Sequence, residues 1–279
     1  MDDGETFVIA LCQYELRDAE SLDGLLRRVD SSFNHAGDAD LYVLPELFVS
    51  DYLEKTGDAD AATVINPERQ AQLHEFLSSA ANERRAVIVG GSYNVIDGGS
   101  TYNRCPIAVP SSGIRTYDKT HLIPEERRQG KRTRDEPAPV VQHKGVGIGV
   151  AVCYDVEFPG FVRSLANRGA EVVAVPSWTA DEAGYQRVRR CSAARAVENQ
   201  LYVVQVSVVG AQLDGDLSGT GRSAVFAPCD DVVGPHGTRL SLPRDEEAAA
   251  TCSVDVTALR KSRTDAAVRP YADANRRED

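Results

Sequence analysis

The sequence lacks the features of a membrane or secreted protein. No run of about 18 apolar residues occurs, and a helix that crosses a bilayer needs roughly 20. The N-terminal stretch MDDGETFVIALCQ is acidic and then strand-like, without the basic region and long apolar core of a signal peptide. We therefore expect no membrane partner and a cytoplasmic localisation.

Cysteine pairs suited to zinc are also missing. The six cysteines include no CxxC pair and no Cys/His spacing typical of a metal site. We expect free thiols in a reducing compartment and no metal. The positions are 12, 105, 153, 191, 229 and 252.

Positive charge is scarce relative to negative charge. The formal net charge is −11 and the sequence pI is about 5.0, so the chain should repel phosphate backbones. Nucleic acid is therefore not an expected partner. Only five lysines occur among the 31 basic residues, which makes each lysine more noticeable.

What the chain does contain is alternation of Val/Ile-rich runs with helical patterns. The expected strands are 7–13, 41–44, 86–91, 107–109, 147–153, 172–176, 201–209 and 251–256, and the expected helices are 19–36, 68–84, 159–168 and 183–199. A Gly-rich turn at 97–99 predicts one antiparallel hairpin. The pattern predicts a single α/β domain with mixed sheets over 1–279, its core at about 5–257 and a polar tail at 258–279, extended or partly disordered from Arg260 onward.

Cys153 follows an apolar strand and precedes a turn into a helix. Open α/β sheets build their sites at the carboxyl ends of strands, and the backbone N–H of Tyr154 could face a developing oxyanion there. A buried structural thiol is the competing interpretation. Glu46 stands just past another buried strand in LYVLPELF, where it is either a desolvated base or a favourable residue at a helix start. Lys119 in TYDKTHLIPEE is either a cation for a thiolate or an exposed surface lysine.

Taken together, these segments resemble the nitrilase superfamily of carbon–nitrogen hydrolases. LPELF, YDKTHLIPEE and CYDVEFPGF occur in the family's order, and VVAVPSW, RCSAARAVENQLYVVQV and SGTGRSAVFAP resemble its later segments. The resemblance covers about residues 5–257. It implies a four-layer α-β-β-α sandwich, no cofactor, and association into a homodimer or higher homo-oligomer.

The resemblance also implies roles for individual residues. Cys153 is the nucleophile that forms a thioester-type intermediate, Glu46 is the general base, and Lys119 supports the tetrahedral intermediate together with the N–H of Tyr154. A second Glu near the lysine should be Glu126, although the adjacent Glu125 remains an alternative.

Some positions bear on the substrate. Tyr154 and Asp155 after the nucleophile favour the amidase-like branch over true nitrilases, which tend to carry Trp-Glu there. Trp178 and Tyr52 are candidates for the substrate pocket, with core packing as the alternative for Trp178. Gly160 stands where the family often has Glu.

The segment 125–136, EERRQGKRTRDE, replaces a stretch that is often aromatic and Gly-containing in the family. We expect a solvated charged loop or a subunit contact, and the alternative is that one of its arginines binds a substrate carboxylate.

The sequence leaves the reaction partly open. We expect hydrolysis of a small aliphatic or ω-amide, with an N-carbamoyl amine or amino-acid hydrolase as the alternative and a nitrilase less favoured. A non-catalytic binding protein and a papain-like Cys–His protease using His121 are the competing classes.

Overall fold

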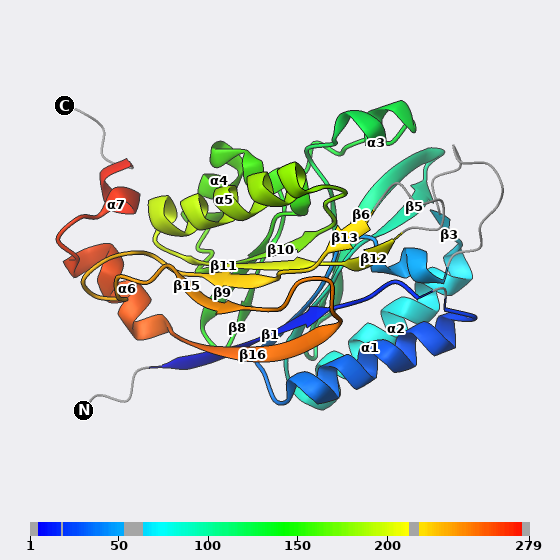
Figure 1. Cartoon of the computed structure of the whole chain (residues 1–279), viewed down its shortest axis with the longest axis horizontal. Coiled ribbons are helices and arrows are strands. Elements are labelled where there is room, and N and C mark those ends of the chain that lie inside the picture. The colour runs from blue at the N-terminus through cyan, green and yellow to red at the C-terminus, as the bar shows by residue number, and fades with distance from the viewer. Residues whose placement is uncertain (1–4, 18, 53–63, 212–217, 275–279) are drawn as a thin grey trace.

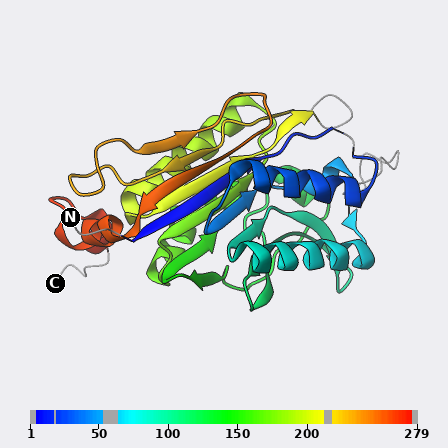
Figure 2. The ribbon, with the colours of Figure 1, turned by 90° about the horizontal axis from the view of Figure 1, so that it is seen from below.

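The computed structural model describes residues 5–17, 19–52, 64–211 and 218–274. Two β-sheets lie face to face, and helices cover the outer face of each (Figures 1 and 2). This arrangement is the α-β-β-α sandwich that the resemblance implied.

The first sheet has the strand order β16-β1-β2-β4-β6-β5-β3, with β7 also paired to β6. Its centre, β1-β2-β4, is parallel, and β16, β6 and β7 pair antiparallel. The predicted hairpin is present between β5 and β6. The bounds are β1 Thr6–Gln13, β2 Leu41–Leu44, β3 Val64–Ile65, β4 Val87–Gly90, β5 Tyr93–Asp97, β6 Ser100–Val109, β7 Gly113–Asp118 and β16 Ala248–Asp255.

The second sheet has the order β15-β14-β11-β10-β9-β8, with β9, β10 and β11 parallel. Its bounds are β8 Val140–His143, β9 Val146–Val150, β10 Val172–Ser177, β11 Tyr202–Ser207, β14 Ala224–Phe226 and β15 Thr238–Ser241. A separate pair, β12 Val209–Ala211 and β13 Ser218–Thr220, stands beside it. The single strand expected over 201–209 is therefore divided between two sheets.

Side-chain alternation along the strands explains the layers. On β2, Leu41 and Val43 belong to the core between the sheets, whereas Tyr42 and Leu44 pack in the cluster under helices α1 (Leu22–Ala36) and α2 (Pro67–Arg84). Successive strand residues point to opposite faces, so a strand buried on both faces is apolar throughout. Helices α4 (Pro159–Asn167) and α5 (Glu182–Asn199) cover the other sheet (Figure 1).

The C-terminal segment differs from the prediction. It forms α6 (Val256–Asp265) and α7 (Pro270–Ala274), where we expected an extended or partly disordered tail. Asp255 caps α6 by accepting from the Ala258 N–H, and Leu259 is fully buried. Because this segment is mostly polar, its sequence did not indicate a helix, and α6 buries only one narrow face. None of the described helices is long and apolar enough to cross a membrane.

Three chain segments follow the carboxyl ends of parallel strands, one in the first sheet and two in the second. Glu46 follows β2, Trp178 follows β10, and Cys153 follows β9. The strand before Cys153 ends at Val150 instead of running to the cysteine, and a 3-10 turn (Cys153–Glu157) begins there. Carboxyl ends of parallel strands are where α/β proteins place their sites.

Candidate active site

Glu46 is held by a tight turn after β2. Its neighbour Leu47 has φ 53°, in the left-handed region, and the Leu47 N–H donates to Ser92 Oγ over 3.1 Å. Gly91 has φ 61°, and a Cβ there would lie 2.2 Å from the Pro45 carbonyl oxygen. Only glycine permits this close approach, so the β4–β5 connection fixes the turn that carries the carboxylate. Glu46 itself is buried.

Lys119 is the cation in contact with this carboxylate. It follows β7, is 2% exposed, and lies 2.8 Å from Glu46 Oε1 and 2.9 Å from Glu126 Oε2. Burial by itself would lower the pKa of Lys119, but the two carboxylates outweigh it and raise the pKa well above its ordinary value. The ammonium therefore stays charged throughout the physiological pH range.

Glu126 is the carboxylate on the far side of the lysine. It is buried, whereas Glu125 is exposed and pairs with Arg128. Burial opposes ionisation of Glu126, but the charge of Lys119, with a further contribution from Lys131, brings its pKa down to about 2. The structure thus places Glu126, and not Glu125, beside Lys119.

Two members of this cluster were not found by sequence reasoning. Asn103 on β6 donates from Nδ2 to Glu46 Oε1 and to Glu126 Oε1, each over 2.9 Å. Lys131 is 5% exposed and its Nζ lies 3.7 Å from Glu126 Oε1. No local pattern marked them, because an Asn inside a strand and a Lys inside a charged run are ordinary in sequence.

Cys153 completes the cluster. Its φ is 48°, and its Sγ–H points at the Trp178 carbonyl oxygen at 3.6 Å, while the Trp178 N–H donates to Glu46 Oε2 over 3.0 Å. Burial, and then the charge of Glu46, raise the pKa of Cys153 well above its ordinary value, although Lys119 acts against them. The resting group is therefore a thiol next to a carboxylate.

The backbone N–H of Tyr154 lies in the turn that begins at Cys153. The Asp155 N–H donates to the Val152 carbonyl, but the Tyr154 N–H donates to no acceptor in the described part of the chain. A free N–H beside a nucleophile can bind a developing oxyanion. The oxyanion role of the Tyr154 N–H stays a prediction.

Asp155 joins the nucleophile turn to the lysine segment. Its fully buried carboxylate accepts from the Val152 N–H (3.2 Å), from Tyr117 OH (2.6 Å) and from the His121 N–H (2.7 Å). His121 Nδ1 also lies 2.8 Å from it. The His121 ring is thus engaged by Asp155 and makes no hydrogen bond to Cys153 among the described residues, which argues against a papain-like pair.

The remaining predicted residues lie less clearly in the site. Trp178 contacts Glu46 and Cys153 through its main chain, and its buried Nε1 has no partner in the described part of the chain. Tyr52 packs against the cluster under α1 and α2, with the Arg69 guanidinium 4.8 Å from its ring centre. Neither side chain is shown to meet a substrate, so both pocket assignments stay predictions.

The segment 125–136 is also less uniform than expected. Its first part forms the short helix α3 (Pro124–Arg128), and Arg134 is bonded to Asp118 and Asp97. Lys131 is buried, so the expectation of a solvated loop does not hold for this residue, whereas the four arginines of the segment are exposed or half-buried.

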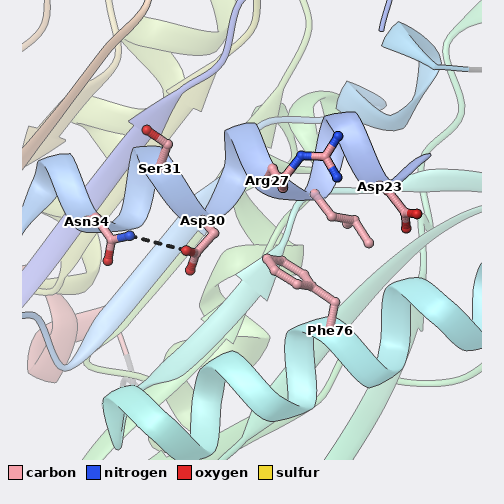
Figure 3. A pocket seen from close by; sticks show the side chains of 7 residues that line it. Asp23, Arg27, Asp30, Ser31, Asn34 and Phe76 are labelled. Atoms are coloured by element: carbon pink, nitrogen blue, oxygen red, sulfur yellow. Dashed lines mark hydrogen bonds between the residues drawn. The ribbon is translucent and has the colours of Figure 1, made fainter. Parts of the chain in front are cut away.

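A surface groove of about 580 Å³ lies away from this cluster, between α1 and α2 (Figure 3). Asn34 donates to Asp30 along its edge over 3.1 Å. The groove is on the outer face of the first sheet, and none of its lining residues bonds to the catalytic cluster. Among the described residues, no group of His, Cys, Asp and Glu side chains is arranged to hold a metal ion.

Comparison with known proteins finds relatives that are named amidases and hydrolases. An (R)-stereoselective amidase from a Pseudomonas species is 33% identical over 92% of this chain and 88% of its own length. The probable hydrolase YhcX of Bacillus subtilis is 30% identical over 97% of this chain, which spans only 54% of that protein.

Solved structures show the same fold. An amidase from Nesterenkonia sp. has a TM-score of 0.71 at 26% identity, covering 92% of this chain and 93% of that one. Saccharomyces cerevisiae Nit3, a member of branch 10 of the nitrilase superfamily, has a TM-score of 0.76 at 22% identity, covering 93% of each chain. The carbon–nitrogen hydrolase family model matches residues 8–261, and the chain therefore belongs to this family of enzymes, with amidases among its relatives.

Proposed function

We propose that the protein hydrolyses the C–N bond of a small linear amide through a thioester formed on Cys153. One observation carries the proposal: a single buried carboxylate, Glu46, is bonded to Lys119 Nζ and to the N–H of Trp178, whose carbonyl accepts from the Cys153 thiol. Base, cation and nucleophile thus share one water-poor cluster, in which electrostatic effects are strong.

In the first half-reaction the resting thiol needs a base, because its pKa lies well above its ordinary value. Glu46 takes the proton as Sγ attacks the carbonyl carbon, and the π electrons move onto oxygen. Lys119 and the Tyr154 N–H stabilise that oxyanion. As the oxyanion collapses the C–N bond breaks, and Glu46 returns the proton to the leaving amine or ammonia.

In the second half-reaction water replaces the amine. Glu46 takes a proton from the water, the resulting hydroxide adds to the thioester carbon, and collapse of the second tetrahedral intermediate breaks the S–C bond. The proton on Glu46 returns to the thiolate, which restores the resting state. Asn103 donates to the base Glu46 and to Glu126, and Glu126 pairs with the cation Lys119, so both catalytic groups are held in place.

The choice of an amide rests on the relatives and on the residues after the nucleophile. Proteins named (R)-stereoselective amidase and 2-oxoglutaramate amidase are 33% and 26% identical to this chain. Acrylamide adds to the active-site cysteine of a variant of the Nesterenkonia amidase, which is 25% identical. The Tyr154-Asp155 pair also favours amides over nitriles.

A substrate panel tests the proposal. Linear amides, N-carbamoyl compounds and nitriles are incubated with enzyme while ammonia and carbon dioxide are measured. We expect ammonia from amides without carbon dioxide; equal release of both gases would instead indicate a carbamoyl hydrolase. Denaturing mass spectrometry during turnover should find an acyl group on the peptide that contains Cys153.

Variants assign the roles. Cys153→Ala should abolish turnover, and Glu46→Gln should lower kcat by roughly 10³-fold or more, because the amide keeps the size of the side chain but takes up no proton from the thiol. Cys229→Ala is the matched control, since Cys229 is an exposed free thiol. Turnover that survives Cys153→Ala would overturn the assignment.

A further inference from the structure

Arg195 belongs to the segment RCSAARAVENQLYVVQV, which has no part in the proposed mechanism. It lies on α5 and is 6% exposed. Its guanidinium makes three hydrogen bonds: Nε donates to the Val156 carbonyl over 3.0 Å, Nη2 to the Glu157 carbonyl over 3.1 Å, and Nη1 to Glu198 Oε1 over 3.0 Å. All three nitrogens of this planar group are therefore used, which fixes its direction.

Both carbonyls belong to the nucleophile turn, the 3-10 turn Cys153–Glu157. The last carbonyls of a helical turn lack partners inside it, and a buried carbonyl without a partner is unfavourable. Arg195 supplies donors to two of them from α5, an element that follows β10 in the chain. The end of the nucleophile turn is therefore fastened to a neighbouring helix.

The nucleophile turn holds its cysteine in a conformation that needs such support. Cys153 has φ 48°, in the left-handed region, which a non-glycine residue keeps only where its surroundings enforce it. At the start of the turn the Asp155 carboxylate accepts from the Val152 N–H over 3.2 Å, and at its end Arg195 holds the last two carbonyls. Cys153 and Tyr154 lie between these two anchors. Loss of one anchor would allow the turn to relax toward ordinary backbone angles.

We propose that Arg195 is a positioning residue, which keeps the Cys153 thiol and the Tyr154 N–H in the arrangement needed for attack on a carbonyl carbon. The inference rests on the proposed function, in which Cys153 is the nucleophile. Within the described part of the chain, none of the hydrogen bonds of Arg195 reaches Cys153 or Glu46. Arg195 therefore acts through the backbone of the turn, and its loss should slow the attack by sulfur without weakening the binding of substrate.

Steady-state amide hydrolysis by Arg195→Ala and Arg195→Lys tests this role. For Arg195→Ala we expect kcat to fall roughly 10- to 100-fold with less than about threefold change in KM, because a small displacement of the nucleophile slows its attack strongly. Arg195→Lys should lose about 3- to 10-fold in kcat, since an ammonium keeps the charge but lacks the planar fork that holds both carbonyls and Glu198. Arg190→Ala is the matched control, because Arg190 is an exposed arginine of the same helix.

Alkylation by iodoacetamide gives a second readout that needs no substrate. Mass spectrometry follows modification of the peptides that contain Cys153 and Cys229 in one sample, and the exposed Cys229 serves as the internal reference. The pKa of the Cys153 thiol is raised by burial, so its reactivity depends on the placement of Glu46 as base. In Arg195→Ala we expect alkylation of Cys153 to slow several-fold while that of Cys229 stays at the wild-type rate.

The outcomes separate positioning from a purely structural role. Wild-type kcat and wild-type alkylation of Cys153 in Arg195→Ala, with only the Tm lowered, would show that the arginine serves stability alone and would overturn the inference. A loss confined to KM would overturn it, and so would a fall in kcat without slower alkylation, because the thiol would then be unmoved. If Arg195→Ala fails to fold, Arg195→Lys carries the test, and wild-type kcat and alkylation in that variant count against positioning. If the wild type hydrolyses no amide, the proposed function fails, whereas slower alkylation of Cys153 confined to the Arg195 variants supports positioning.

Discussion

Replacing Asn103 tests whether the two buried carboxylates act as one unit. Its Nδ2 donates to Glu46 and to Glu126 over 2.9 Å each, and its backbone carbonyl accepts from the Lys119 N–H over 2.9 Å. Asn103→Leu keeps the branch at Cγ and the backbone bond, but removes both side-chain donors. The two carboxylates would then face each other with only the cations between them.

The expected fall in kcat follows from the hydrogen bonds that Asn103→Leu removes. A hydrogen bond to a charged group contributes about 1.5–3 kcal/mol, so the pair amounts to roughly 3–6 kcal/mol before relaxation. Lys119 still bonds both carboxylates, so we expect part of this loss to be recovered. We predict a 10- to 100-fold fall in kcat, which corresponds to about 1.4–2.8 kcal/mol, with a smaller change in KM.

Asn103→Asp sharpens the test through pH. A third carboxyl between two carboxylates has a raised pKa, because like charges disfavour ionisation. Below that pKa the new group is protonated and donates one hydrogen bond. Above it the group repels its neighbours, so activity should be lost as pH rises. The wild type should show no such loss on the alkaline side from this position.

The assay is steady-state ammonia release between about pH 5 and 9, with thermal unfolding measured in parallel. Asn94→Leu is the matched control: Asn94 is buried, pairs with Asn103 across β5 and β6, and makes no hydrogen bond to Glu46 or Glu126 among the described residues. Wild-type kcat in Asn103→Leu, or the same loss in both Leu variants, would refute the reasoning.

Three further changes test the frame around the site. Gly91→Ala should lower stability by roughly 1–3 kcal/mol and reduce kcat, since its Cβ would displace Pro45; a variant with unchanged Tm and kcat would contradict the close approach. Asp155→Asn should lower kcat about 10- to 100-fold with little change in KM, because the carboxylate that anchors the turn before Cys153 loses its charge. Stopped-flow measurement of the acylation rate checks this prediction. An effect on KM alone would count against it. Glu126 has a folded pKa of about 2 against an ordinary value of 4.5, so its ionisation stabilises the fold above pH 4.5, and this contribution disappears as pH falls toward 2. Urea unfolding should therefore find wild type more stable than Glu126→Gln, by on the order of 3 kcal/mol at neutral pH and by little near pH 2, and a pH-independent difference would contradict the linkage.

Much of the site could be predicted from the sequence because it lies at strand ends. Apolar runs mark β2 and β9, and a polar residue just after such a run falls at the carboxyl edge of a sheet. This position made Glu46 and Cys153 candidates, and the resemblance to the superfamily then gave their predicted roles and that of Lys119. The same patterns predicted α1, α2, α4 and α5 with boundaries within a few residues.

The strands and site residues that the sequence did not predict were missed for physical reasons. Strands β7, β8 and β12 to β15 are short or pair at sheet edges, where weak alternation gives little signal. Asn103 reaches both glutamates only because β6 lies opposite the two loops that carry them. Nothing in the neighbouring sequence distinguishes it from an ordinary strand residue whose side chain is hydrogen-bonded. Lys131 resembles its exposed neighbours in sequence, and its burial depends on the return of the chain after α3.

Hydrophobic periodicity by itself indicated an α/β fold and the main strands and helices, because periodicity is a local property, and the resemblance of short motifs to the superfamily made Cys153, Glu46 and Lys119 the predicted thiol, base and cation. Only the tertiary structure decided which carboxylate meets Lys119, that Asn103 bridges both glutamates, and that Lys131 is the basic residue of its segment buried beside Glu126. Those facts depend on distances between segments far apart in the chain. Burial then converts these distances into the pKa shifts of Lys119, Glu126 and Cys153.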